Sequence, residues 1–367
     1  MPKMRVIISG GGTGGHIFPA IAIANAIKAK TREVEFLFVG ADNRMEMEKV
    51  PEAGYEIVGL PIIGIQRSLS LKNLKIPFKL MASLKKAKQI IKEFKPDVAV
   101  GVGGYASGPL LYMANKLKIP TLIQEQNSYA GLTNKLLSKK AACICVAYDG
   151  METFFPKEKI IKTGNPVRAE MVKIRGKEEE ARLYFGLEKG KKTLLIVGGS
   201  LGAWAINEAI EGALQDLRRA GIQLVWQTGK AFYKRAQDAV KGIEKEVKVH
   251  EFIKPMDLAY AASDLVVSRA GAMAVSELML VHKPVIFVPL PTAAEDHQTK
   301  NAEVLVKKNA ALMVENAKAK SELGEKVIKL LKDKEYLNKM SEQMRQLGIN
   351  NAADRIADEV IKLAVRK

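Results

Sequence analysis

The residues of this chain best suited to chemistry lie in short glycine-rich and polar clusters, most of which follow apolar runs. The first cluster is residues 9–16, Ser-Gly-Gly-Gly-Thr-Gly-Gly-His. Glycines let a backbone approach a ligand closely, and the start of a helix offers unpaired N–H groups to an anion. His16 could accept a proton from a substrate, or it could be a structural hydrogen-bonding residue near the start of a helix.

The same loop also satisfies a dinucleotide-binding pattern. Gly10, Gly12 and Gly15 match G-x-G-x-x-G, which holds a pyrophosphate in nicotinamide-dependent oxidoreductases. Asp42, near the end of the second apolar run, could then bind the ribose. The pattern alone does not separate such an oxidoreductase from other nucleotide-binding proteins.

Three further clusters lie in the N-terminal half. Residues 102–109 follow an apolar run, and an ordinary turn is the alternative there. Residues 124–127 and 130–135 gather polar side chains after another apolar run, which favours ligand contact over a solvated loop. Residues 164–168 end in Arg168, whose guanidinium matches a phosphate but which could equally be a surface arginine.

The C-terminal half contributes three clusters of the same kind. Residues 198–203, Gly-Gly-Ser-Leu-Gly-Ala, form a second glycine turn suited to a diphosphate. Residues 268–277 lead from a strand into a helix, where Glu277 could hold ribose hydroxyls or serve as a cap or salt-bridge partner. Residues 288–301 contain His297 and Gln298, which could contact a donor sugar or lie in a polar surface loop.

The sequence shows no recognisable metal-binding pattern. It contains no Asp-x-Asp pair, no clustered His and Cys residues and no Walker loop, and only four histidines occur in 367 residues. A histidine-rich metal site is therefore not expected. Helix ends and backbone N–H groups would hold a diphosphate instead.

The elements that position these clusters alternate between short apolar runs and helical segments, as in parallel doubly wound sheets. We predict strands at residues 5–9, 35–39, 98–102, 121–124, 193–197, 223–226, 265–268 and 284–288. A helix is predicted at residues 19–30, and the segment after about residue 321 is helical. The pattern predicts two Rossmann-like domains, residues 1–165 and 166–340, whose strand ends face a cleft. A C-terminal helix at about 341–367 is expected to pack back on the first domain.

Composition and charge limit the class of protein. The 47% hydrophobic fraction suffices for two cores, and the net charge of +18 implies an acidic partner or a lysine-rich surface. Cys143 and Cys145 lie in an apolar run, which indicates core packing in a reducing cytosol. We expect neither a signal peptide nor a membrane span, so any membrane contact should be peripheral.

Residues 69–95 combine apolar and basic side chains. Leucines, Ile76, Phe78 and Met81 alternate with six lysines over most of this segment. Such a segment suits an anionic membrane surface. An amphipathic helix with its apolar face in the domain core is the alternative.

Together and in this order, the clusters resemble the MurG family, glycosyltransferase family 28, whose members add N-acetylglucosamine to a lipid-linked muramyl-peptide precursor of peptidoglycan. The matching stretches extend from residue 11 to about residue 301. The resemblance implies a GT-B fold and an inverting transfer from UDP-N-acetylglucosamine to lipid I, which yields lipid II. It also implies that the transfer needs no essential active-site metal and no cofactor. It also favours the membrane interpretation of residues 69–95, because such enzymes take a lipid-anchored acceptor.

The resemblance also implies roles for individual residues. His16 would deprotonate the acceptor hydroxyl, and Glu277 would bind the ribose of the donor. The implied donor-binding residues are Thr13, Gly14, Gly15, Asn127, Arg168, Ser200, Ile253, Ala272, Met273, Glu277, His297 and Gln298. The implied acceptor-binding residues are Gly103, Gly104, Tyr105, Glu125 and Asn134. Some family members have a glutamine pair where this chain has His297 and Gln298, so the sugar contact at His297 departs from the pattern.

The resemblance implies a location and partners as well. We expect a peripheral protein on the cytoplasmic face of the cell membrane, with a UDP-sugar donor, a lipid-linked acceptor and recruitment to a cell-wall synthesis complex. A related transferase that glycosylates another lipid would share the donor half, but residues 131–135 argue against it. An oxidoreductase leaves the second glycine turn and Glu277 unexplained. A nucleic-acid-binding protein is suggested by charge alone, without a supporting motif.

Overall fold

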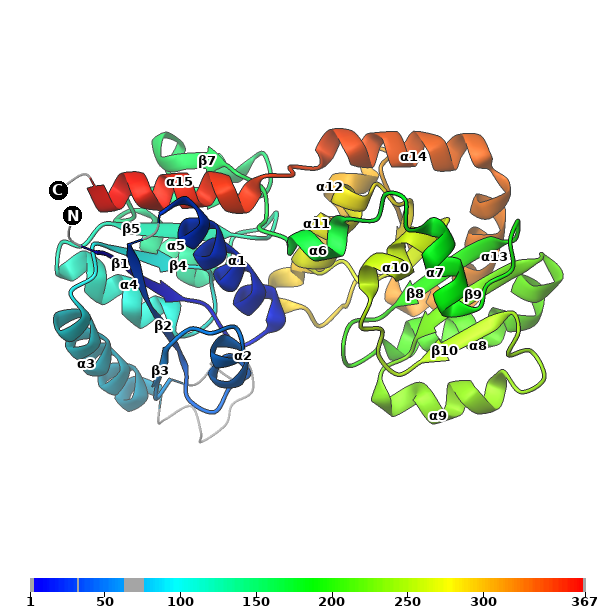
Figure 1. The fold of residues 1–367 in the computed structure, drawn as a ribbon, viewed down its shortest axis with the longest axis horizontal. Helices are drawn as coiled ribbons and strands as arrows, with labels where there is room; N and C mark the ends of the chain where they lie inside the picture. Colours follow the sequence, from blue (N-terminus) through cyan, green and yellow to red (C-terminus); the bar gives the residue numbers. More distant parts are fainter. Residues whose placement is uncertain (1–2, 32, 63–75, 366–367) are drawn as a thin grey trace. The chain divides into compact units, whose positions relative to one another are not determined.

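The computed structural model describes residues 3–31, 33–62 and 76–365, and it contains two compact units. Unit 1 combines Met1–Arg168 with Ile349–Lys367, and unit 2 is Ala169–Gly348. Each unit has its own parallel sheet flanked by helices (Figure 1). The predicted α/β class with two Rossmann-like domains is confirmed.

In unit 1 the described residues form a seven-stranded sheet with the order β3-β2-β1-β4-β5-β6-β7, in which every pair is parallel. The strands are β1 (Met4–Ser9), β2 (Val34–Ala41), β3 (Ile57–Leu60), β4 (Val98–Gly101), β5 (Thr121–Glu125), β6 (Cys143–Val146) and β7 (Ile160–Lys162). The order reverses between β1 and β4, which is where open parallel sheets bind ligands. The loops after β1 and β4 therefore lie at the switch point of the sheet.

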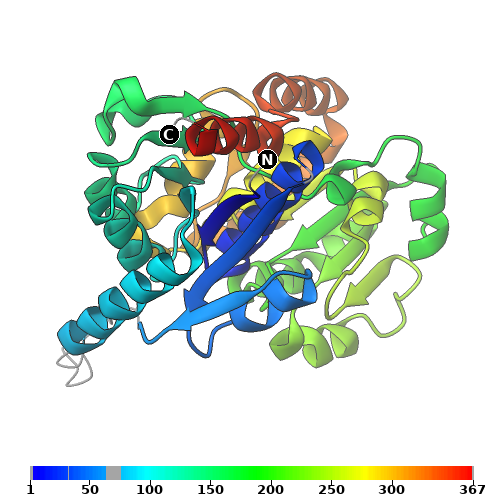
Figure 2. The ribbon, with the colours of Figure 1, turned by 60° about the vertical axis from the view of Figure 1, so that its left-hand side comes forward.

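The helices of unit 1 cover both faces of this sheet (Figure 2). They are α1 (Gly14–Lys30), α2 (Glu46–Glu52), α3 (Ile76–Phe94), α4 (Ser107–Lys116), α5 (Leu132–Ser138) and α15 (Ala352–Val365). Val6 and Ile8 of β1 point to one face, and Ile7 points to the other, because side chains alternate along a strand. The first face packs against α1 and α15, and the second packs against α3 and α4.

The C-terminal helix α15 returns to unit 1 and packs against α1, which joins the two ends of the chain in one core (Figure 1). The predicted segment 341–367 is divided at Gly348: its first residues belong to the helix α14 of unit 2, and α15 belongs to unit 1. The break follows Leu347, where Gly348 and the residues after it leave the helical conformation.

Helix α1 begins earlier than predicted. The sequence places its start at Pro19, a residue favoured in the first helical turn, whereas the helix begins at Gly14 with Thr13 as its N-cap. Pro19 is the sixth residue of the helix, where it cannot donate a hydrogen bond to the carbonyl oxygen of Gly15 and its ring crowds that oxygen. His16 consequently lies in the first turn of α1 rather than in the loop before it.

In unit 2 the described residues form a six-stranded parallel sheet with the order β10-β9-β8-β11-β12-β13, which switches between β8 and β11. The strands are β8 (Lys192–Val197), β9 (Ile222–Gln227), β10 (Val247–His250), β11 (Leu265–Ser268), β12 (Val285–Phe287) and β13 (Leu312–Met313). The helices are α6 (Ala169–Val172), α7 (Glu178–Phe185), α8 (Trp204–Arg219), α9 (Lys230–Ala239), α10 (Met256–Ala262), α11 (Ala272–Val281), α12 (His297–Val306), α13 (Ala319–Lys332) and α14 (Lys334–Leu347).

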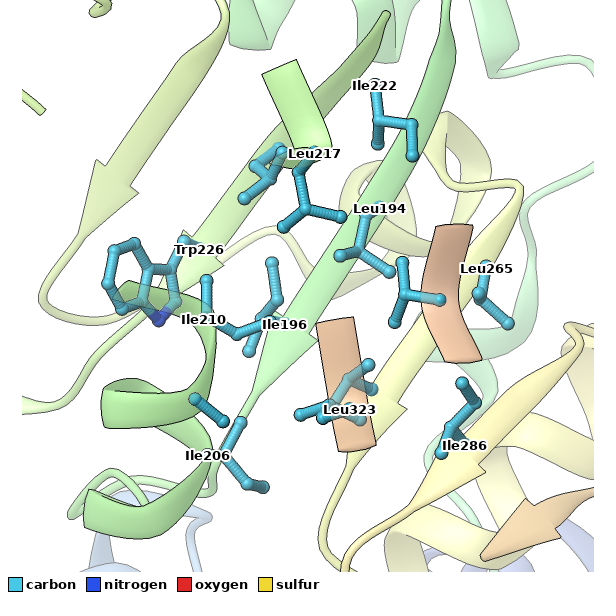
Figure 3. Packing of buried hydrophobic residues seen from close by; sticks show 14 of the residues in the cluster. Leu194, Ile196, Ile206, Ile210, Leu217, Ile222, Trp226, Leu265, Ile286 and Leu323 are labelled. Carbon is cyan, nitrogen blue, oxygen red and sulfur yellow. The ribbon is translucent and has the colours of Figure 1, made fainter. Parts of the chain in front are cut away.

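The core of unit 2 lies between this sheet and the helices α8 and α13. Figure 3 shows Leu194 and Ile196 of β8 among Ile206 and Ile210 of α8 and Leu323 of α13. These side chains are fully buried, and each such burial contributes about 1.5–3 kcal/mol relative to exposure. The carboxyl end of β8, where the second glycine turn begins, is thus fixed by a rigid core.

The cysteines and the hydropathy of the helices can also be described. Cys143 and Cys145 are buried thiols on β6, as core packing requires. In the parts of the chain that the structure describes, no helix combines the length and the apolar character that crossing a membrane demands.

Candidate active site

The first turn of α1, directly after the loop that follows β1, presents His16 in a defined orientation. The backbone oxygen of Thr13 accepts hydrogen bonds from the N–H groups of His16 (3.0 Å) and Ile17 (3.2 Å), which starts the helix. Nδ1 of His16 lies 3.0 Å from the carbonyl oxygen of Gly11. A carbonyl oxygen can only accept, whereas Oγ1 of Thr13, 3.4 Å from the same nitrogen, can accept as well as donate. The shorter contact to Gly11 therefore favours the tautomer with the proton on Nδ1 and the basic lone pair on Nε2.

The loop after β4 lies directly against this histidine. Gly103 and Gly104 have φ angles of +99° and +88°, which favour glycine. A Cβ atom at Gly103 would stand 2.8 Å from Nε2 of His16, and one at Gly104 would overlap with the backbone of Gly11. Neighbouring Tyr105 is half exposed. The structure thus brings His16 together with the loop predicted to bind the acceptor.

Glu125, at the end of β5, organises the loop that follows it. Its buried Oε1 accepts hydrogen bonds from the backbone N (3.1 Å) and Nδ2 (3.3 Å) of Asn127. Its Oε2 accepts from the backbone N of Gly131 (3.0 Å) and from Nδ2 of Asn134 (2.8 Å). The carboxylate therefore fixes the predicted ligands Asn127 and Asn134 by charge-assisted hydrogen bonds.

A buried amide network joins this loop to the segment that ends at Arg168. Gln124 donates to Oδ1 of Asn165 (3.0 Å), and Asn165 donates to the backbone oxygen of Gln126 (2.9 Å). The guanidinium of Arg168 lies 4.6 Å from the ring centroid of Phe18 on α1, a cation–π distance. Within unit 1, the predicted residues thus gather at one edge of the sheet.

In unit 2, the glycine turn after β8 is held by Gln227 at the end of β9. Nε2 of Gln227 donates to the backbone oxygen of Gly199 (3.1 Å), and its Oε1 accepts from the backbone N of Ile253 (2.8 Å). Ser200 is exposed in the turn, whereas the side chain of Ile253 is buried. One buried side chain therefore connects the two predicted donor-binding segments.

Helix α11 begins beside the switch point of unit 2. Gly271 is its N-cap in extended conformation, and Ala272 and Met273 form its first turn, so its N–H groups are available to an anion. Glu277 lies farther along the helix, half buried. Its Oε2 accepts a hydrogen bond from the hydroxyl of Tyr260 on α10 (3.0 Å), which orients the carboxylate.

The start of helix α12 carries His297 and Gln298. The preceding Glu295 and Asp296 have φ angles of +54° and +55°, and left-handed backbone at such residues costs about 1–3 kcal/mol each. Nδ1 of His297 donates to the backbone oxygen of Ala294 (2.7 Å), and Oε1 of Gln298 accepts from the N–H of Leu290 (3.0 Å). The strained turn thus sets both side chains in place.

Arg269 supports this loop from the end of β11. Its Nη1 donates to the backbone oxygens of Val288 (2.8 Å) and Pro289 (3.0 Å) and to Oδ1 of Asn316 (2.8 Å). Burial lowers the pKa of Arg269 to about 10, so the side chain stays charged at neutral pH. It links β11, β12 and the chain after β13.

Sequence reasoning missed Glu46, Gln227 and Tyr260, which act on the site through neighbouring residues. Each is a single polar residue outside the glycine-rich clusters. The available signal was position: Gln227 is the last residue of a strand, and Glu46 opens a helix soon after one. Among the described residues, no group of three or more His, Cys, Asp or Glu side chains is arranged to hold a metal ion.

Comparison with known proteins identifies the family. Residues 6–146 match the glycosyltransferase family 28 N-terminal domain, and residues 193–357 match the glycosyltransferase family 28 C-terminal domain. The chain belongs to glycosyltransferase family 28. The first match lies within unit 1, and the second covers most of unit 2 and extends into α15 of unit 1.

Two relatives are similar in sequence to this glycosyltransferase over its whole length. A protein of Parabacteroides distasonis is 54% identical over 100% of both chains, and one of Phocaeicola vulgatus is 56% identical over 99% of this chain and 97% of its own. Both are named UDP-N-acetylglucosamine–N-acetylmuramyl-(pentapeptide) pyrophosphoryl-undecaprenol N-acetylglucosamine transferase. The crystal structure of Acinetobacter baumannii MurG matches with a TM-score of 0.80 at 30% identity, over 98% of this chain and 100% of that one. The GT-B fold is thereby established.

Proposed function

We propose that this glycosyltransferase moves N-acetylglucosamine from UDP-N-acetylglucosamine to the lipid-linked muramyl-pentapeptide, lipid I, to form lipid II in peptidoglycan synthesis. The observation that carries the proposal is the uninterrupted match to relatives named for this reaction, at 54–56% identity over nearly the whole of both chains. The residues predicted for the acceptor and the donor lie at or after the carboxyl ends of strands in the two sheets, where α/β proteins bind ligands.

His16 supplies the base in the proposed mechanism. Its Nδ1–H is held by Gly11, so Nε2 takes the proton of the acceptor hydroxyl as that oxygen attacks the anomeric carbon of the donor sugar. The bond between this carbon and the β-phosphate oxygen breaks, and its electron pair leaves with UDP. A single displacement of this kind inverts the anomeric centre.

Unit 2 holds the donor in this proposal. The N–H groups at the start of α11 and in the turn around Ser200 face the diphosphate and stabilise the charge that develops on it. Glu277, oriented by Tyr260, binds the ribose hydroxyls. His297 and Gln298, at the start of α12, contact the nucleotide and sugar. This donor set requires no metal.

The test is direct transfer of label. Purified protein is incubated with radiolabelled UDP-N-acetylglucosamine and a short-chain analogue of the lipid-linked muramyl-pentapeptide, with and without chelator. We expect labelled lipid at equal rates in both. Absence of transfer by a protein that binds UDP would overturn the acceptor assignment, and loss of transfer only with chelator would overturn metal independence.

We also propose that the N-terminal end of α3 docks the enzyme peripherally on the cytoplasmic membrane surface. The far end of this helix is anchored in the core through Ala87, Ile90 and Ile91. Near its start, Phe78 and Met81 are 77% and 70% exposed and share a helix face, beside Lys79 and further lysines. Figure 2 shows this end of α3 directed away from the sheet of unit 1. Residues 69–75 of the predicted segment lie outside the described residues.

Vesicle binding tests the docking surface. Phe78→Ser/Met81→Ser should sediment several-fold less with anionic vesicles than the wild type, while turnover of the short-chain acceptor stays unchanged. Leu183→Ser, at a 75% exposed position of α7 in unit 2, is the matched control. Equal sedimentation of the double variant and the control would refute the surface. Recruitment to a cell-wall synthesis complex stays a prediction, for which co-purification from cross-linked cells is the check.

A further inference from the structure

Glu46 is a buried carboxylate without an assigned role. It is the first residue of α2 and is 0% exposed. Its Oε1 accepts a hydrogen bond from the backbone N of Ala41 (3.0 Å), and its Oε2 accepts from the backbone N of Gly12 (2.8 Å). Burying a carboxylate costs several kcal/mol unless such partners compensate it.

Two glycines, one just after β1 and one near the end of β2, leave space for the Glu46 side chain. A Cβ atom at Gly11 would overlap with the Glu46 carboxylate, and one at Gly40 would stand 2.5 Å from its Cγ. Two glycines thus allow a charged group to sit against the backbone of the loop after β1. Packing alone could be satisfied by an apolar side chain of similar volume.

The two hydrogen bonds at Gly11 and Gly12 belong to one peptide group. Glu46 accepts from the N–H of Gly12, and His16 Nδ1 donates to the C=O of Gly11. This N–H and C=O are the two ends of the planar peptide that joins residues 11 and 12. A continuous chain of hydrogen bonds therefore connects the Glu46 carboxylate, this peptide group and the imidazole ring.

A carboxylate that accepts from one end of a peptide polarises the other end. Hydrogen bonds in such a chain strengthen one another by about 10–30% each, so the Gly11 oxygen becomes a stronger acceptor for Nδ1–H. The same negative charge also stabilises the ring when Nε2 has taken up a proton. Carboxylates orient histidines directly in many sites; here a peptide group lies between them.

We infer that Glu46 is a positioning residue for sugar transfer, which acts through the Gly11–Gly12 peptide to hold His16 in its Nδ1–H tautomer and to stabilise the protonated ring. This inference rests on the proposed role of His16 as the base. Nε2 of the ring lies beside Gly103, in the loop predicted to bind the acceptor. An error in tautomer would therefore present an N–H, instead of a lone pair, to the acceptor hydroxyl.

The experiment compares Glu46→Gln with Asp97→Asn. Oδ2 of Asp97 accepts from the backbone N of Arg5 (2.8 Å) at the opposite edge of the same sheet, so both variants neutralise a carboxylate that receives a backbone N–H. We expect Glu46→Gln to lower kcat about 10- to 100-fold with KM for UDP-N-acetylglucosamine within about twofold, and Asp97→Asn to leave kcat within about threefold. Glu46→Asp, which keeps the charge, should recover part of the loss.

Two further readouts separate positioning from general destabilisation. The ¹⁵N shifts of the His16 ring should report the Nδ1–H tautomer in the wild type and a mixture in Glu46→Gln. In a double-mutant cycle, adding Glu46→Gln to His16→Ala should cause no further loss of kcat, because Glu46 acts through His16.

The outcomes distinguish this inference from the proposed function. If the wild type transfers sugar and His16→Ala is inactive, but Glu46→Gln retains wild-type kcat and tautomer, the role of Glu46 is refuted and the function stands. Additive losses in the double variant refute it as well. If His16→Ala retains turnover, the base assignment itself fails.

Discussion

The glycine loops that follow the central strands of the two sheets are both clamped by a buried side chain, but the clamps differ in charge. In unit 1 the clamp is the carboxylate of Glu46, which accepts from Gly12. In unit 2 it is the neutral amide of Gln227, which donates to Gly199 and accepts from Ile253. A carboxylate favours a proton arriving nearby, whereas it would repel an anion. The difference matches the proposed tasks: proton uptake at the first loop and diphosphate binding at the second.

The largest expected effect tests the first loop. His16→Ala should lower kcat by about 10²- to 10⁴-fold, the usual contribution of a positioned base, while the Kd for UDP stays unchanged because the histidine serves the acceptor. Steady-state kinetics and calorimetry measure the two quantities. His282→Asn is the control, since His282 ends α11 with a φ of +55° that asparagine tolerates. Turnover of His16→Ala within tenfold of wild type would contradict the assignment.

The next effect tests the second unit alone. Glu277→Ala should raise KM for the donor about 10- to 100-fold, since a hydrogen bond to a charged group is worth about 1.5–3 kcal/mol, with a much smaller change in kcat. Tyr260→Phe keeps the carboxylate but removes the hydroxyl that orients it, so KM should rise only a few-fold. An unchanged donor KM in Glu277→Ala would place the ribose elsewhere.

Exchanging the charge of the second clamp sharpens the comparison. Gln227→Glu cannot donate to Gly199 and adds a negative charge beside the turn proposed to hold the diphosphate, so donor KM should rise by about tenfold. Gln227→Ala removes the clamp without adding charge and should have a smaller effect on KM. If the two variants behaved alike, the neutrality of this clamp would carry no functional meaning.

The glycine loops could be predicted from the sequence, whereas the side chains that hold them could not. The apolar runs and glycine turns predicted both sheets, because buried parallel strands are continuously hydrophobic and the loops need glycine backbones. Short strands such as β13 and the early start of α1 were missed, since tertiary contacts rather than local composition decide them. The roles of His16, Glu277 and the other predicted site residues stay predictions. The clamps Glu46 and Gln227 depend on contacts between distant segments, which no local pattern encodes.

The smallest expected effect concerns how the two units respond to acid. In unit 2 the ring of His250 stacks edge-to-face on Phe185 at 5.5 Å between centroids, and its buried Nε2 has no hydrogen-bond partner among the described residues. Burial lowers the pKa of His250, and burial chiefly lowers that of His282. Both rings therefore bind protons more readily in the unfolded chain. The stability of unit 2 should fall as the pH drops below about 6.5, the unfolded value, toward the folded ones.

Hydrogen exchange of core amides in the two sheets, corrected for intrinsic rates, measures this difference between pH 7.5 and 5.5. Carboxylates titrate mainly below this window, so the histidines dominate it. His16 is the one histidine in the sequence of unit 1. Exchange protection of the Ile7 and Ile8 amides in unit 1 should therefore change less than that of the Leu194 and Ile196 amides in unit 2. His250→Phe preserves the aromatic contact and should remove part of the difference, with the remainder due to His282. Equal loss of protection in both sheets would show that the buried rings of unit 2 do not control its acid sensitivity.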